Sequence, residues 1–151
     1  MSDHPRNLDD EQLQWVKESG GVVQTVALGT FINKEKNAAF KKAKDSLLKL
    51  NPEAVLETIK KSNPPVNVSD FVDHIDYIKN KIGIDHVGIS SDFDGGGGIE
   101  GWKDASETFN VTLELVKRGY TEEEIAKIWS GNLLRVLEET QRVAEELQAK
   151  N

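Results

Sequence analysis

The residues His86-Val-Gly-Ile-Ser-Ser-Asp92-Phe-Asp94-Gly95-Gly-Gly-Gly98 form a short apolar run that breaks off into two carboxylates and four glycines. The run Val87 to Ile89 is typical of a strand buried on both faces, and turn-forming residues end it. Asp92 and Asp94 therefore follow the carboxyl end of a predicted strand, which is the end that carries ligand sites in parallel α/β folds. Because glycine adopts positive φ and permits close backbone approach, we interpret the loop as a site. A flexible, solvated loop is the alternative.

A second strand is predicted over residues 21–28, Gly-Val-Val-Gln-Thr-Val-Ala-Leu, where Gln24 is the one strongly polar residue. The pattern before it indicates a helix capped by Asn7, in which Leu13 and Val16 share a face. The glycine pair 20–21 suits the end of that helix.

Helices are expected between and after the two strands. Residues 34–61 predict two helical pieces that meet near Asn51, with Pro52 opening the second. After the breaker Ser62-Asn-Pro-Pro, a helix begins near Ser69 and ends at Gly83. Its apolar residues fall on one stripe, which comprises Phe71, Ile75, Ile78 and Ile82.

The C-terminal third shows two capping-box signals. Asp104 to Glu107 precedes a helix whose apolar residues are Phe109, Leu113 and Val116, and Thr121 to Glu124 precedes Ile125, Ile128 and Trp129. Gly131-Asn132 then leads into a last helix. Its charged tail, residues 145–151, is expected to fray.

This order of helices and strands is the alternation of a helix-rich α/β fold with parallel strands. Two parallel strands cannot cover their own edges, since a parallel sheet needs several neighbours and covered faces. We therefore interpret residues 1–151 as a single partial domain, part of a larger barrel or sheet.

The composition excludes several function classes. The chain has 151 residues, a formal net charge of −7 and no cysteine. A thiolate zinc site and a disulfide framework are therefore excluded, and the acidic balance argues against nucleic-acid binding. No apolar run approaches the length of a membrane span, and no targeting segment is recognised at the N-terminus.

No preformed metal or nucleotide site is evident in the sequence. The three histidines, His4, His74 and His86, lack the spacing of a zinc motif. His86 lies at the opposite end of its strand from Asp92, and His74 flanks an apolar stripe where a packed or capping histidine is expected. The positions that a calcium loop fills with oxygen ligands hold Gly96 and Lys103, and no Gly-Lys-Ser/Thr phosphate loop follows the glycines.

Arg6 lies in the segment Asp3-His-Pro-Arg-Asn7, directly before the first predicted helix. In a βα alternation this segment belongs to the loop after a preceding strand, which places Arg6 on the same face as Asp92. A guanidinium binds a carboxylate bidentately, and an aspartate orients an ammonium group or a catalytic water. The alternative is a solvent-exposed arginine near the N-terminus.

The chain resembles the C-terminal part of the membrane (renal) dipeptidases, zinc peptidases of (β/α)8 TIM-like barrel fold related to the amidohydrolases. The resemblance rests on five ordered motifs, which are Asp3-His-Pro-Arg-Asn-Leu-Asp-Asp-Glu-Gln-Leu13, Gly20-Gly-Val-Val23, Asp73-His-Ile-Asp-Tyr-Ile78, Gly83-Ile-Asp-His-Val-Gly-Ile-Ser-Ser-Asp-Phe-Asp-Gly95, and Arg118-Gly-Tyr-Thr-Glu-Glu-Glu-Ile125 followed by Gly131-Asn-Leu-Leu-Arg-Val136. It implies the last two barrel strands with their helices. Tyr77 departs from the histidine of many relatives, and Ser90-Ser91 replaces a glycine-containing pair.

The resemblance also implies a reaction, the hydrolysis of dipeptides at a binuclear zinc centre. By resemblance, Arg6 binds the carboxylate of the substrate, and Asp92 assists both the hydrolytic water and the amino end of the dipeptide. The zinc ligands of the family, a His-x-Asp pair, a bridging Glu and two further His, come from earlier strands and are absent from this chain. We therefore expect the chain alone to be inactive and to require the missing barrel half or a second copy. A non-catalytic fragment that dimerises and binds a small ligand is the alternative.

Overall fold

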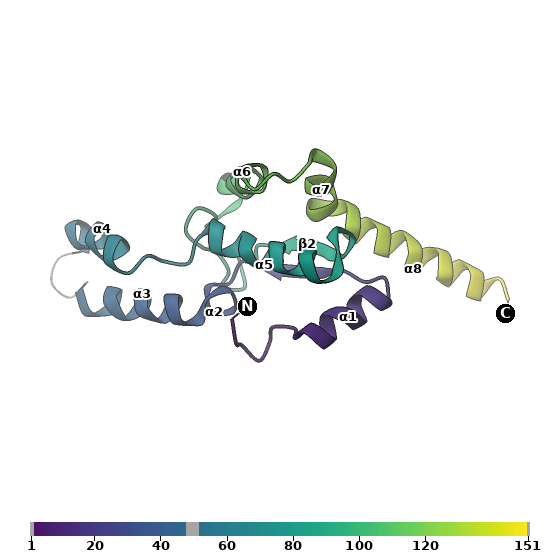
Figure 1. Cartoon of the computed structure of the whole chain (residues 1–151), viewed down its shortest axis with the longest axis horizontal. Coiled ribbons are helices and arrows are strands. Elements are labelled where there is room, and N and C mark those ends of the chain that lie inside the picture. The colour runs from purple at the N-terminus through teal and green to yellow at the C-terminus, as the bar shows by residue number, and fades with distance from the viewer. Residues whose placement is uncertain (1, 48–51, 151) are drawn as a thin grey trace.

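The structure is a computed structural model that describes residues 2–47 and 52–150. Two strands lie among helices, with α3 and α4 at one end of the molecule and α8 extending from the other (Figure 1). The elements in chain order are α1 (Asp10–Glu18), β1 (Val23–Val26), α2 (Gly29–Ile32), α3 (Lys34–Leu47), α4 (Pro52–Ser62), α5 (Val68–Ile82), a 3-10 turn (Ile84–His86), β2 (Val87–Ser90), a second 3-10 turn (Ala105–Glu107), α6 (Phe109–Lys117), α7 (Glu122–Ala126), a π-helical segment (Lys127–Gly131) and α8 (Asn132–Gln148). The predicted helix-rich α/β class is confirmed.

The two strands pair in parallel, with Val23 opposite Val87 and Val26 opposite Ser90. The parallel arrangement agrees with the sequence prediction, although both strands are four residues long and thus shorter than expected. The prediction that β2 starts at His86 is wrong, because that residue ends a 3-10 turn.

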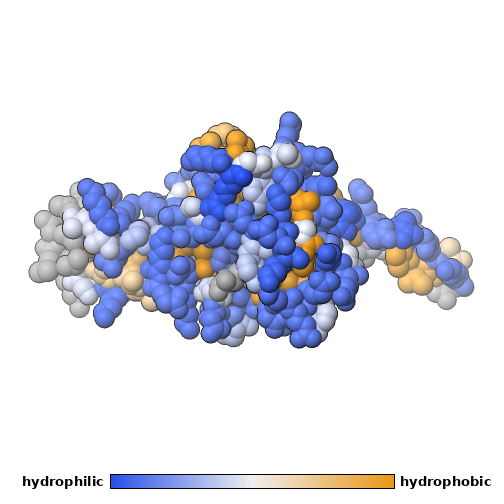
Figure 2. Space-filling view, in the orientation of Figure 1, coloured by the Kyte–Doolittle hydropathy of each residue, from blue (hydrophilic) through white to orange (hydrophobic). Residues whose placement is uncertain are grey.

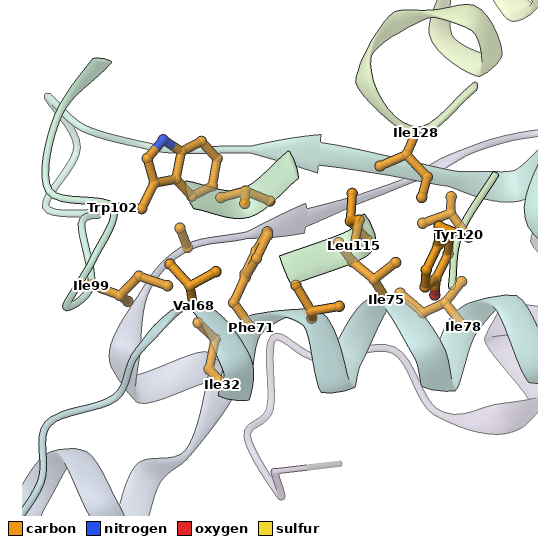
Figure 3. Close-up of a cluster of buried hydrophobic side chains, with 14 of the residues drawn as sticks. Ile32, Val68, Phe71, Ile75, Ile78, Ile99, Trp102, Leu115, Tyr120 and Ile128 are labelled. Atoms are coloured by element: carbon orange, nitrogen blue, oxygen red, sulfur yellow. The ribbon is translucent and has the colours of Figure 1, made fainter. Parts of the chain in front are cut away.

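Helix α5 covers one face of this sheet. Figure 3 shows Phe71, Ile75 and Ile78 pointing from α5 toward the strands. These three side chains and Ile82 are at most 3% exposed, so the predicted stripe is the buried face of the helix. Fully burying each such side chain stabilises a fold by roughly 1.5–3 kcal/mol. The helix ends at Gly83, as predicted.

The N-terminal cap of α1 is Asp9 rather than the predicted Asn7. The Asp9 side chain accepts a hydrogen bond from the backbone N–H of Gln12, whose side chain accepts one from the backbone N–H of Asp9. The Asn7 side chain instead donates to the carbonyls of Ser2 and Phe31, at 3.0 and 2.8 Å. Because Asp9 and Gln12 satisfy each other in both directions, Asn7 is free to tie the N-terminal segment to α2.

The first C-terminal capping signal serves a 3-10 turn rather than α6. Asp104 accepts from the backbone N–H of Ser106, whereas α6 begins without a side-chain cap. The apolar residues named for this helix do not form its packed face, since Phe109 is 70% exposed. Helix α6 instead buries Val111 and Leu115.

The second capping box, at Thr121, is confirmed by its bonds with Glu124. The helical run continues through Gly131-Asn132 into α8, and the Asn132 side chain turns inward and donates to the carbonyls of Ile84 and Val87. The tail is helical through Gln148, contrary to the expected fraying.

That last helix gains support from intrahelical ion pairs of Arg142 with Glu139 and Glu146. Pro52 opens α4 as predicted. The predicted junction at Asn51 and the final residue of the tail, Asn151, lie outside the described residues.

The glycine loop folds back on its own beginning. The backbone N–H groups of Gly95 and Gly97 both donate to the carbonyl of Asp92, at 3.1 and 2.6 Å, and Gly98 N donates to the Ala27 carbonyl at 2.9 Å. A Cβ at Gly97 would lie 2.1 Å from the Ser91 carbonyl oxygen. These glycines therefore permit close backbone-to-backbone approach, which returns the loop to the end of β1.

An ion-pair network joins α5 to the end of α6. Arg118 Nη1 lies 2.7 Å from Asp73 and 2.6 Å from Asp76, and its Nε lies 3.0 Å from Glu114. Burial disfavours the charged guanidinium, but the hydrogen bonds to these carboxylates outweigh it and raise the pKa of Arg118 above its ordinary value. The network is therefore part of what holds α6 against α5.

We predict that R118Q lowers the free energy of unfolding by about 2 kcal/mol, because it leaves three carboxylates close together without their cation. Urea unfolding followed by circular dichroism measures the loss. The control is R142Q, whose guanidinium is 54% exposed on α8, and it should cost less than about 0.5 kcal/mol. Equal losses in the two variants would contradict this account of the network.

We also predict that G97A destabilises the chain by about 1–3 kcal/mol, because a Cβ cannot fit against the Ser91 carbonyl without moving the loop. G21A is the matched control, since its Cβ would meet nothing closer than 3.3 Å. The same urea measurement compares them. If G97A unfolds at the denaturant concentration of the unaltered chain, the tight turn is not required.

Candidate functional site

Asp92 lies two residues after the carboxyl end of β2. Its backbone has φ 53°, a left-handed conformation that aspartate tolerates better than most residues do. The side chain folds over Gly95, where a Cβ would lie 2.2 Å from Asp92 Oδ1. Asp92 is exposed, and its carboxylate lies over Gly95 of the glycine loop.

The neighbouring Phe93 anchors this loop in the core. Its ring packs edge-on against Trp102, with 5.5 Å between the ring centroids. Asp94, the second predicted carboxylate, is exposed and makes no hydrogen bond or ion pair with any residue in the described ranges. The loop thus alternates two exposed carboxylates with one partly buried ring.

Arg6 lies beside the carboxyl end of β1. Its guanidinium carbon is 5.2 Å from the ring centroid of Phe31, in α2, which closely follows β1. The His4 ring also packs on Phe31, and His4 Nδ1 accepts a hydrogen bond from the Arg6 backbone N–H at 3.2 Å. A cation over an aromatic face gains roughly 0.5–1 kcal/mol at an exposed position. Phe31 therefore helps to position the guanidinium.

The two predicted site residues lie at the end of the sheet where its parallel strands finish. Arg6 lies beside that end of β1, and Asp92 follows that end of β2. Within the described part of the chain, no hydrogen bond or ion pair joins Arg6 to Asp92. Arg6 lines a groove of about 430 Å³ along β1, whereas Asp92 lies on the β2 side. This arrangement leaves the two opposite charges free to contact a bound ligand. Their roles in binding stay predictions.

The histidines are occupied by other contacts. His74 Nε2 lies 2.9 Å from the Ile32 carbonyl, and burial lowers the pKa of the His74 imidazole. His86 Nδ1 lies 2.8 Å from the Gly21 carbonyl, at the amino end of the strands. Residues 2–47 and 52–150 contain no group of three or more His, Cys, Asp or Glu side chains that could hold a metal ion. The donor set in this part of the chain therefore does not fit a metal centre.

Sequence reasoning missed the part played by Phe31. An aromatic residue soon after a strand is a weak signal on its own, and only the fold brings the N-terminal segment onto it.

No helix in the described ranges is both long enough and apolar enough to cross a bilayer.

Comparison with known proteins identifies the family. The whole chain, residues 1–151, matches the family described as membrane dipeptidase (peptidase family M19). The chain is 34% identical to dipeptidase ataJ of Aspergillus terreus over 99% of its length and 31% identical to human dipeptidase 3 over its full length. It spans only 30% and 25% of those two proteins, respectively.

Solved structures agree with this result. The probable dipeptidase PvdM from Pseudomonas aeruginosa superimposes with a TM-score of 0.68 at 38% identity, over 89% of this chain and 40% of PvdM. A metallopeptidase from Rhodobacter sphaeroides, liganded with a phosphinate mimic of the dipeptide L-Ala-D-Ala, shares the fold with a TM-score of 0.67 at 24% identity, over 88% of this chain and 31% of that protein. The chain belongs to the membrane dipeptidase family, peptidase family M19.

Proposed function

We propose that this chain supplies the substrate-binding side of a zinc-dependent dipeptidase, as the C-terminal part of a (β/α)8 barrel. The observation that carries the proposal is that Asp92 follows the carboxyl end of β2 and that Arg6 packs on Phe31, soon after the carboxyl end of the adjacent parallel strand β1. Enzymes built on (β/α)8 barrels place their active sites at this end of the strands. Family membership supports the substrate class.

The charges of these two residues suit the two ends of a dipeptide. The planar guanidinium of Arg6 can bind the terminal carboxylate through two parallel hydrogen bonds. The Asp92 carboxylate can bind the terminal ammonium group and can accept a proton from the water that attacks the peptide carbonyl. A cation and an anion at a fixed separation would favour a ligand with both termini close together, which is the property that distinguishes a dipeptide from a longer peptide.

Zinc would supply a polarised water at neutral pH when bound. Because the donor set described above does not fit a metal centre, we propose that the zinc ligands come from residues outside this chain. The residues of this chain then bind and orient the substrate but do not hold the metal.

The open edge of β1 is where we propose that further barrel strands join. The groove along it has apolar walls, to which Leu13, Val16 and Ile78 contribute. An unpaired parallel edge is a site for added strands. Apolar side chains are also exposed on the helices, and Figure 2 shows them over α6 and along α8. They include Phe109, Leu113, Val116, Leu133, Leu134, Leu137, Val143 and Leu147. We propose that the remaining barrel half, from the same gene or a complementing chain, covers them; a second copy of this chain is the alternative.

We predict that the isolated chain has no dipeptidase activity. A ninhydrin assay with alanyl and dehydro-dipeptides, in the presence of added zinc, measures the release of free amino acids. Turnover that a chelator abolishes would contradict the proposal that the metal ligands lie outside the chain.

Substrate binding provides the test of the proposed function itself. We predict that isothermal titration calorimetry detects L-Ala-D-Ala binding to the chain, and that R6Q and D92N each weaken it about tenfold or more, because each removes a charge-assisted contact worth roughly 1.5–3 kcal/mol. R142Q, on the exposed face of α8, is the matched control and should bind as the unaltered chain does. If R6Q and D92N bind the dipeptide as tightly as R142Q does, these residues do not form the substrate site.

A further inference from the structure

Helix α3 presents one face to the glycine loop. Four of its residues line a cavity of about 280 Å³ between the helix, the loop and residues 99–103, and they fall at helical spacing i, i+3, i+4 and i+7. These residues are Asn37, Phe40, Lys41 and Lys44. The helix is seated against the end of β1, because the Asn37 side chain packs on Gly29, where a Cβ would lie 2.8 Å from Asn37 Oδ1.

The rim of this cavity is positively charged. Lys41 and Lys44 are exposed and form no ion pair with any residue in the described ranges. Lys103 also lines the cavity, and its ammonium lies 3.1 Å from Glu100, the one carboxylate in the lining. Glu100 is already neutralised, since Lys60 contacts it at 2.9 Å as well. A cluster of cations on a chain of net charge −7 is a local reversal of sign.

The floor of the cavity is apolar. Val66 and Ile99 are each 4% exposed, and the half-buried Phe40 and Pro65 complete it. Gly96, in the opposite wall, has a backbone N–H that makes no hydrogen bond within the described part of the chain. An apolar floor below ammonium groups and a free amide matches a short aliphatic stem that ends in a carboxylate.

We propose that this cavity is a subsite for an anionic side chain of the aspartyl or glutamyl type, held between Lys41, Lys44 and the Gly96 amide. Its glycine wall, Gly96 and Gly98, belongs to the loop that carries Asp92. The assignment of the carboxylate to a dipeptide rests on the proposed function, whereas the binding of a carboxylate does not. The subsite selects dipeptides with an acidic side chain.

The test compares ligands of nearly equal shape with and without the acidic group, by isothermal titration calorimetry on the full chain. L-Ala-L-Glu is titrated against L-Ala-L-Gln, L-Glu-L-Ala against L-Gln-L-Ala, and glutarate against its uncharged diamide. The variant K41Q/K44Q removes the cations of the rim. K34Q/K42Q removes two charges from exposed positions of α3 that do not line the cavity.

We expect the unaltered chain and K34Q/K42Q to prefer the acidic member of at least one dipeptide pair by about fivefold, the scale of partly exposed ion pairs. K41Q/K44Q should lose that preference, and added salt should weaken it. Absence of any acidic preference, or an equal loss in both double variants, overturns the subsite.

The glutarate pair separates this inference from the proposed function. Glutarate binding that depends on Lys41 and Lys44, with no dipeptide binding, supports a carboxylate site in the cavity and contradicts the proposed dipeptide site. Binding of both neutral dipeptides through Arg6 and Asp92, with no preference for any acidic ligand, supports the proposed function and overturns the subsite.

Discussion

The parallel pairing of β1 with β2 is the interaction on which the site depends. It brings two distant segments of the chain side by side, and the bonding continues past the strands, since Ala27 N donates to the Ser90 carbonyl and Gly98 N donates to the Ala27 carbonyl, each at 2.9 Å. The loops that directly follow the two strands therefore lie at the same end of the sheet. The N-terminal segment reaches the same end because Arg6 packs on Phe31, soon after β1.

Two parallel strands are not a stable unit by themselves, so the pairing needs support from other elements. The buried face of α5 supplies it on one side, where Phe71 and Ile75 are fully buried. Asn132 supplies it near the start of β2, where its side chain binds the Val87 carbonyl. Nothing in the described ranges pairs with the other edge of β1. This edge is the one at which the proposed further barrel strands would pair.

Features set by local pattern were predictable from the sequence. The stripe of α5, its end at Gly83, the second capping box and the two parallel strands all follow from periodicity and turn chemistry. The position of Asp92 was predictable as well, because the turn-forming residues after Ile89 mark the carboxyl end of the strand and Asp92 closely follows it.

Features set by competition between nearby groups were not predictable. Asn7 and Asp9 are both good helix caps, and the choice depends on Gln12 and on a distant Phe31 carbonyl. Helix α6 has apolar residues on more than one side, so the pattern alone could not select the side that α5 covers. The cavity beside Lys41 was invisible for a related reason, since it exists only where α3 meets a loop far along the chain.

The most direct test of the central claim, that one dipeptide bridges Arg6 and Asp92, is a titration of isotope-labelled chain with L-Ala-D-Ala followed by nuclear magnetic resonance. The account predicts that signals of Arg6 and Phe31 shift together with those of Asp92 and Gly95, and that both sets fit a single dissociation constant. Shifts confined to one of the two sets, or two different dissociation constants, would contradict it.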